Sequence, residues 1–123
     1  MSIFKTRSFA RWAKREGLID SDLDDAVAEM AKGLIDARLR GGLIKKRIAR
    51  MGYGKRGGYR VILASNLRER WVFMFGFAKN ERDNIDHHEL RLMKRLASAF
   101  LEMDDRMLEK ALISGEIVEI SHG

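Results

Sequence analysis

Hydrophobic positions divide the chain into a helical start, a strand-rich middle and a helical end. Residues 3–6 are predicted to form a short strand, followed by two amphipathic helices that form a hairpin, because only a few residues separate them. Ser8 is predicted to cap the first helix and Gly17 to end it, while Ser21 and Asp24 form a capping pattern for the second. The apolar positions of the two helices are Phe9, Trp12, Ala13, Leu23, Ala26, Val27, Met30 and Leu34.

The middle of the chain is predicted to contain three strands, at residues 43–50, 59–64 and 71–77. The last is almost entirely apolar, as expected of a central strand covered on both faces. Ser65 and Asn66 form a short turn that predicts an antiparallel hairpin. One side of the first strand carries Ile44, Lys46, Ile48 and Arg50, and the other carries Leu43, Lys45, Arg47 and Ala49. A flexible basic loop is predicted before the second strand from Gly52, Gly54, Gly57 and Gly58.

Helical periodicity returns after Arg82. Asp104 or Asp105 is predicted to cap a last helix that Gly115 ends, and residues 117–120 to add a small strand. Together these elements predict an α+β fold, a twisted antiparallel sheet with an N-terminal helical hairpin and C-terminal helices packed on it. A length of 123 residues fits a single domain, 1–123. The apolar face of the first C-terminal helix consists of Leu90, Met93, Ala97, Phe100 and Leu101.

Basic residues are concentrated in the strand-rich middle. Between Arg38 and Arg82 there are 13 Lys or Arg and two acidic residues, a net charge of +11, whereas the rest of the chain carries −5. Such a cluster can be no more than the solvated face of a sheet. Here, however, it is interleaved with glycines and with Tyr53 and Tyr59, which favours a single-stranded nucleic acid held by phosphate contacts and base stacking.

The composition excludes several kinds of site. Cysteine is absent, so disulfides, zinc–thiolate centres and cysteine nucleophiles are excluded, and a cytoplasmic location is expected. No apolar run approaches the roughly 18 residues that cross a bilayer. His87, His88 and Glu89 are too divergent on a helix to predict a metal site, and the glycines lack the lysine of a phosphate loop. We therefore expect no cofactor and no metal.

Two motifs, GGYRVIL at residues 57–63 and FAKNER at residues 77–82, carry a resemblance that covers residues 3–120. Together with IKKRIAR, they resemble the RelE superfamily of bacterial toxins, and within it the HigB-like branch. The resemblance implies a type II toxin–antitoxin system and cleavage of mRNA in the ribosomal A site. It also implies a cognate antitoxin, often a helix-turn-helix DNA-binding protein.

Metal-free RNA cleavage needs a base for the 2′-hydroxyl, an acid for the leaving 5′-oxygen and cations for the phosphate. The resemblance assigns catalytic roles to Lys45, Arg47 and Arg60, with Arg60 on the transition-state phosphate. His87, or its neighbour His88, is the candidate for proton transfer because histidine titrates near neutral pH, with Lys45 as the alternative base. Further RNA contacts are expected from Lys46, Arg50, Tyr53, Lys55, Arg56, Tyr59, Lys79 and Arg82.

The chain departs from the family pattern at two positions. Asn80 stands where a phosphate-binding arginine is expected, and Asp86 stands near the position of a stacking tyrosine. These departures affect the proton-transfer step more than RNA binding. Two other functions stay open. A ParE-like toxin on the same fold would inhibit gyrase, although such toxins usually lack the basic sheet residues. A nucleic-acid-binding regulator would bind in a salt-dependent way without cleaving.

Overall fold

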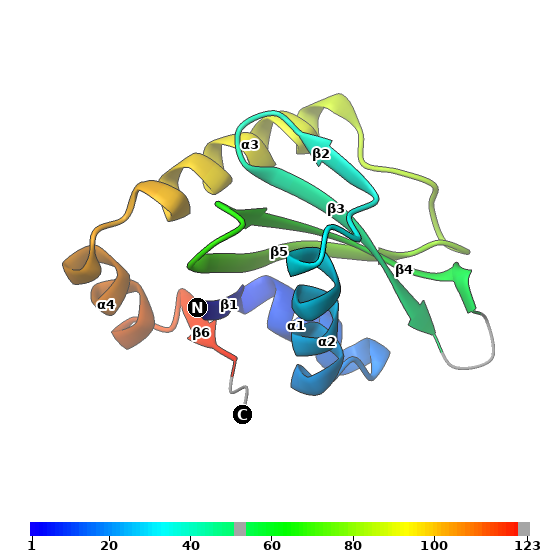
Figure 1. Ribbon diagram of the computed structural model, residues 1–123, viewed down its shortest axis with the longest axis horizontal. Helices are drawn as coiled ribbons and strands as arrows, with labels where there is room; N and C mark the ends of the chain where they lie inside the picture. The colour runs from blue at the N-terminus through cyan, green and yellow to red at the C-terminus, as the bar shows by residue number, and fades with distance from the viewer. Residues whose placement is uncertain (51–53, 121–123) are drawn as a thin grey trace.

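The computed structural model describes residues 1–50 and 54–120, with side chains other than those of residues 50 and 54–56. It confirms an α+β fold of four helices and one six-stranded sheet (Figure 1). The elements in chain order are β1 (Ser2–Thr6), α1 (Arg7–Glu16), α2 (Asp20–Ala31), β2 (Ala37–Leu39), β3 (Leu43–Arg50), β4 (Gly54–Ser65), β5 (Arg70–Ala78), α3 (His87–Glu102), α4 (Asp105–Ile113) and β6 (Ile117–Glu119).

The strand order in the sheet is β2-β3-β4-β5-β1-β6. The predicted hairpin of β4 and β5 is confirmed, with Ser65 opposite Trp71. The sheet is mostly antiparallel, but β1 runs parallel to β5, with Ile3 opposite Trp71. The C-terminal strand β6 then pairs with the free side of β1. The first strand of the chain is therefore held between two strands that are made much later.

Helices cover both faces of the sheet, and two hydrophobic clusters divide the core. The cluster on the α1/α2 face includes Phe9, Val27, Trp71 and Phe73. The cluster on the α3/α4 face includes Ile62 and side chains from both C-terminal helices. Figure 1 shows α2 on one side of the sheet and α3 on the other. Because successive side chains of a strand point to opposite faces, this division decides which basic residues can act together.

The N-terminal helices begin earlier than predicted. Thr6, not Ser8, caps α1, and its side chain accepts a hydrogen bond from Phe9 N–H. Residues Ser21 and Asp24 do not cap α2, which starts at Asp20; instead Asp22 accepts the N–H of Ile19 at 2.9 Å. In both cases the helix begins directly after a residue with extended backbone, and not at the serine that was predicted to cap it. Leu34 lies beyond α2 and is 58% exposed, so its assignment to the apolar face was wrong.

Gly17 ends α1 as predicted, in the left-handed conformation with φ of 78°. Packing of α1 and α2 against each other as a hairpin stays a prediction. In the described part of the chain, no helix combines the length and apolar character that a membrane crossing requires.

Two features of the basic segment differ from the prediction. Gly54 to Gly58 belong to strand β4 and do not form a loop: Gly54 lies opposite Arg50 of β3, and the Gly58 carbonyl accepts the N–H of Lys79. This pairing overrides the local preference of glycine. Gly52, which was predicted to belong to the same loop, lies outside the described residues. A short strand, β2, precedes β3 and was not predicted. The turn that joins them contains Gly41 and Gly42, both with φ of 80°, a conformation that suits glycine.

The C-terminal half follows the prediction closely. Asp86 and Glu89 form a capping box at the start of α3, and Asp104 caps α4 by accepting Met107 N–H at 2.8 Å. Gly115, with φ of 78°, then turns the chain into β6, which confirms the predicted terminal strand.

Candidate active site

Two arginines lie side by side on the α3/α4 face of the sheet. Arg47 of β3 is directly opposite Arg60 of β4, and Arg60 is opposite Phe77 of β5, so the three form a row across the sheet. Arg60 is only 7% exposed. Burial lowers the pKa of its guanidinium, the positive charge of Arg47 lowers it further, and the carboxylate of Asp36 acts in the opposite direction. The pair is a concentrated positive charge that a phosphate would stabilise.

Asp36 holds Arg47 in place. It precedes β2, and its Oδ2 accepts the backbone N–H of Arg47 at 2.6 Å. The Nε atom of Arg47 lies 3.6 Å from Oδ1 of the same carboxylate. Half of the Arg47 side chain remains exposed, so its guanidinium can still reach a ligand. One carboxylate therefore offsets part of the repulsion between the two arginines without enclosing them.

Lys45 lies two residues before Arg47 and points to the same face. Its Nζ donates to Oδ1 of Asn84 at 3.0 Å, and this oxygen also accepts the N–H of Ile85. Asn84 belongs to the connection between β5 and α3. The contact holds β3 against the connection between β5 and α3.

Arg82 fastens the same connection to α3. Its guanidinium lies over the rings of Phe75 and Phe77, at 5.7 and 5.4 Å from their centroids. It pairs with both carboxylate oxygens of Glu89, with Nη1 at 3.0 Å from Oε2. Hydrogen bonding from Arg82 lowers the pKa of Glu89, and the Glu89 carboxylate raises the pKa of Arg82. Arg82 thus holds the first turn of α3 beside the cationic face.

The Arg82–Glu89 pair predicts a pH-dependent contribution to stability. The pKa of Glu89 in the folded chain is below the ordinary 4.5, so the pair stabilises the fold above that pH and less as the pH falls through the lowered value. We expect Glu89→Gln to reduce the free energy of unfolding at pH 7 and to differ less from wild type as the pH falls. Urea unfolding of both proteins at pH 7, 5, 4 and 3 measures this. A difference that stays constant with pH would show that the charge of Glu89 is irrelevant.

His87 and His88 are the first two residues of α3, and both are exposed. His88 Nδ1 lies 3.3 Å from Nη2 of Arg91, on the outer side of the helix. Because Arg82 binds Glu89 in the same turn, the start of α3 borders the cationic face. A role of His87 in proton transfer stays a prediction.

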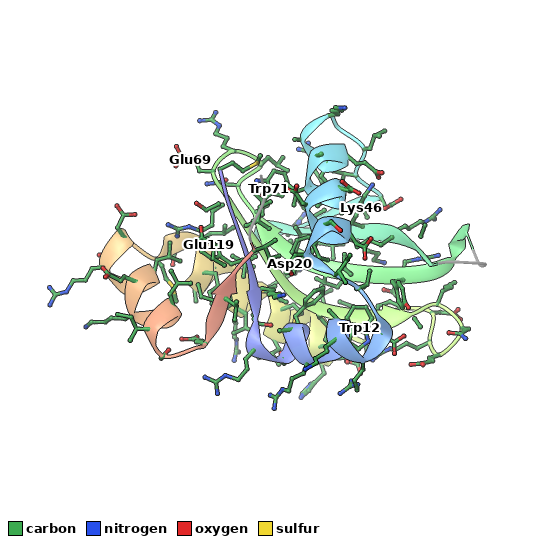
Figure 2. All side chains as sticks on the ribbon, turned by 90° about the horizontal axis from the view of Figure 1, so that it is seen from below. Trp12, Asp20, Lys46, Glu69, Trp71 and Glu119 are labelled. Atoms are coloured by element: carbon green, nitrogen blue, oxygen red, sulfur yellow. The ribbon has the colours of Figure 1, made fainter. Side chains whose placement is uncertain are left out.

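Lys46 and Tyr59 lie on the opposite face from Arg60. The Lys46 side chain is buried against α2 (Figure 2), where Nζ donates to Oε1 of Glu29 at 2.6 Å and to the Leu34 carbonyl at 2.9 Å. Tyr59 packs edge-on against Trp12 and donates its hydroxyl to the Glu16 carbonyl at 2.9 Å. The structure therefore does not bring either residue together with Arg47 and Arg60.

The other predicted RNA contacts are only partly described. Lys79 follows β5 and pairs with Asp83 at 2.9 Å, and this hydrogen bond lowers the pKa of Asp83. Tyr53 lies outside the described residues. The side chains of Arg50, Lys55 and Arg56 also lie outside them, although their backbones belong to β3 and β4.

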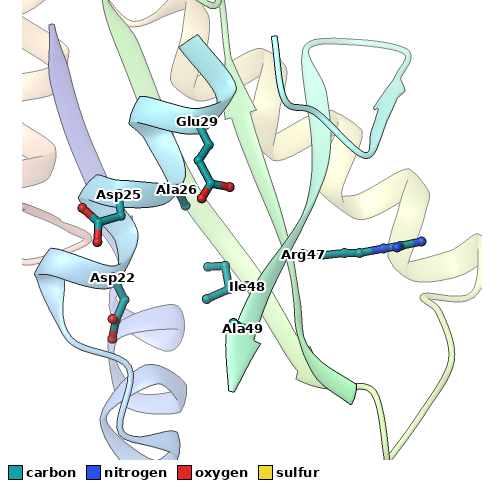
Figure 3. A pocket seen from close by; sticks show the side chains of 7 residues that line it. All are labelled: Asp22, Asp25, Ala26, Glu29, Arg47, Ile48 and Ala49. Carbon is teal, nitrogen blue, oxygen red and sulfur yellow. The ribbon is translucent and has the colours of Figure 1, made fainter. Parts of the chain in front are cut away.

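The other side of β3 is acidic. A hollow of about 160 Å³ lies between α2 and β3. It is lined by three carboxylates, those of Asp22, Asp25 and Glu29, and by Ala26, Arg47, Ile48 and Ala49. Figure 3 shows that these carboxylates come from α2, whereas the Arg47 side chain points away from them. An acidic lining repels phosphate, so a nucleic acid is expected on the α3/α4 face.

Three residues of the site were not found by sequence reasoning: Asp36, Asn84 and Glu89. The D-x-x-E spacing of Asp86 and Glu89 is a capping-box signal that identifies the start of α3, but nothing local links Glu89 to Arg82. Within residues 1–50 and 54–120 no group of three or more His, Cys, Asp or Glu is arranged to hold a metal ion.

Comparison with known families gives a match over most of the chain. The family model described as the RelE toxin of the RelE/RelB toxin–antitoxin system matches residues 1–120. No curated protein matches the chain. The matched residues include the helices and strands of the fold, the Arg47–Arg60 pair and the connection between β5 and α3. The chain belongs to the RelE family, the toxins of toxin–antitoxin systems, and an antitoxin is its implied partner.

Proposed function

We propose that this toxin is a ribosome-dependent mRNA endoribonuclease that cleaves codons in the A site. The observation that carries the proposal is the Arg47–Arg60 pair, opposite each other on one sheet face with Lys45 beside them. RelE membership supports the substrate, and the acidic lining behind β3 leaves the α3/α4 face for RNA. The cognate antitoxin, of the helix-turn-helix type, is the proposed regulator, and the cytoplasm is the proposed place of action.

The proposed chemistry is a transesterification within the RNA. A base removes the proton of the 2′-hydroxyl, the O2′–P bond forms and the P–O5′ bond breaks, while an acid gives a proton to the leaving 5′-oxygen. The products are a 2′,3′-cyclic phosphate and a 5′-hydroxyl. Arg60 and Arg47 stabilise the extra negative charge on the phosphate, and the buried environment of Arg60 strengthens that interaction.

Proton transfer is assigned to the groups that border this pair. Lys45 lies on the same strand face as Arg47, and His87 starts α3 beside the Arg82–Glu89 contact. Histidine is the side chain most often used for general acid and base catalysis in enzymes. Lys79 and Arg82 are proposed to flank the RNA backbone at the end of β5.

The test is primer extension on a reporter mRNA in a reconstituted translation reaction, with and without ribosomes. Wild type is expected to give cuts in phase with codons only when ribosomes translate the message. Arg47→Ala is expected to weaken them on the order of 10- to 100-fold, because one of the two phosphate-binding cations is lost.

Intact mRNA in every reaction, from protein shown to be folded, would contradict the nuclease proposal. Inhibition of gyrase supercoiling by the same preparation would then favour the ParE-like function. RNA binding without cleavage would favour a regulator, and its affinity would fall steeply with salt.

A further inference from the structure

We propose that Asn84 is a positioning residue, which orients the ammonium group of Lys45 beside the Arg47–Arg60 pair. This role rests on the proposed function and deepens it, because it assigns a task in RNA cleavage to a residue outside the cationic strands. Asn84 lies in the connection of residues 79–86 between β5 and α3. Its main chain and its side chain contact two different cations, Arg82 and Lys45.

The main chain of Asn84 is held by Arg82. The Asn84 carbonyl accepts hydrogen bonds from Nε of Arg82 at 3.1 Å and from Nη2 at 2.9 Å. The same guanidinium pairs with Glu89 of α3 and lies over the rings of Phe75 and Phe77 of β5. Because these contacts come from a helix and from a strand, they fix the place where the main chain at residue 84 passes the sheet.

The side chain of Asn84 connects this fixed point to β3. Its Oδ1 accepts the N–H of Ile85 at 2.9 Å and the ammonium group of Lys45 at 3.0 Å. Both partners are donors, so the atom that faces them is the amide oxygen and not the amide nitrogen. The bond to the neighbouring N–H restricts rotation of the amide group. The oxygen therefore points at Lys45 before a substrate is bound.

Lys45 needs such a partner more than the two arginines do. A lysine side chain rotates about four bonds, so an ammonium group without a fixed partner is spread over many positions. Arg60 is buried, and Asp36 holds Arg47. Lys45 is on the same strand face, only partly buried, and its ammonium group is held by Asn84. Proton transfer and charge stabilisation both depend on exact distances, so a held ammonium group raises the rate.

The experiment is a double-mutant cycle, measured by single-turnover cleavage on programmed ribosomes. At saturating toxin, Lys45→Ala is expected to lower the rate on the order of 100-fold and Asn84→Ala on the order of tenfold. The double variant is expected to cleave at the rate of Lys45→Ala, because Asn84 acts through Lys45. The toxin concentration for the half-maximal rate is expected to change less than about twofold in Asn84→Ala, since the bound state keeps its other contacts.

Asn66→Ala is the matched control, because it removes the same side chain from another connection. The Asn66 side-chain oxygen accepts the N–H groups of Arg68, Glu69 and Arg70 in the turn between β4 and β5, at the end of β5 away from Asn84. We expect this variant to cleave at the wild-type rate. Urea unfolding of every variant ensures that folded proteins are compared.

Three results would overturn the role of Asn84 while leaving the nuclease proposal intact. These are wild-type cleavage by Asn84→Ala, wild-type cleavage by Lys45→Ala, and losses that multiply in the double variant, as two independent defects do. In each of them the wild-type toxin still cleaves. Absence of cleavage by the wild-type toxin would contradict the nuclease proposal itself, and the role of Asn84 with it, so the two failures are distinguishable.

Discussion

Arg60→Ala is expected to lower the rate of ribosome-dependent mRNA cleavage by about 10²- to 10³-fold, the usual cost of removing one group that stabilises a transition-state charge. Arg60 is buried beside Arg47. In such an environment water compensates for a lost guanidinium less well than it does at an exposed site. Arg60→Lys is expected to recover only part of the rate, because an ammonium group lacks the planar pair of donors. Single-turnover cleavage on programmed ribosomes measures both variants.

Arg68→Ala is the matched control for Arg60. Arg68 is exposed in the turn between β4 and β5, and its loss changes the net charge equally. We expect wild-type cleavage from it. Equal losses in the Arg60 and Arg68 variants would mean that overall charge, and not the arginine pair, determines activity. Urea unfolding of each variant separates a lost fold from a lost catalytic group.

Glu29→Ala is expected to reduce the free energy of unfolding by about 3 kcal/mol, because it leaves the buried ammonium group of Lys46 without its carboxylate. Lys46 is 4% exposed and lies 2.6 Å from Glu29. We place the loss at the low end of the range for broken buried pairs because the Glu29 side chain is 37% exposed. Urea unfolding at pH 7 measures the change.

Two further variants test this explanation. Asp25→Ala removes an exposed carboxylate from the same helix and is expected to change stability by less than about 0.5 kcal/mol. Glu29→Ala combined with Lys46→Met removes both charges and is expected to recover most of the loss. If the double variant is as unstable as Glu29→Ala, the loss comes from helix α2 itself and not from the unpaired ammonium.

Strands β3 and β5 could be predicted from the sequence, because the pattern of apolar and polar residues in each strand matches its position in the sheet. Residues 43–50 were predicted with the bounds that the structure shows, and the apolar run at 71–77 is the centre of β5. The glycines at 54–58 misled the prediction, since their place in β4, which pairs with β3 and β5, decides their conformation. The parallel pairing of β1 with β5 depends on contacts distant in sequence, which no local pattern reports.

The candidate site was predictable only in part. Strand alternation places Lys45 and Arg47 on one face and Lys46 on the other, and the structure confirms that division. Which face α2 covers with carboxylates is a tertiary property. Both sequence neighbours of Lys46 are candidate catalytic residues. Only the structure shows that Lys46 itself is a buried partner of Glu29.

The position of β1 has a consequence for how the toxin is made. This strand is synthesised before its two neighbours in the sheet, β5 and β6, and β6 ends at Glu119. Contacts between such distant segments form slowly, because a long stretch of chain must first be closed into a loop. The sheet is therefore completed only after the residues of β6 have been synthesised. The toxin therefore reaches its folded state only some time after its first strand has been translated.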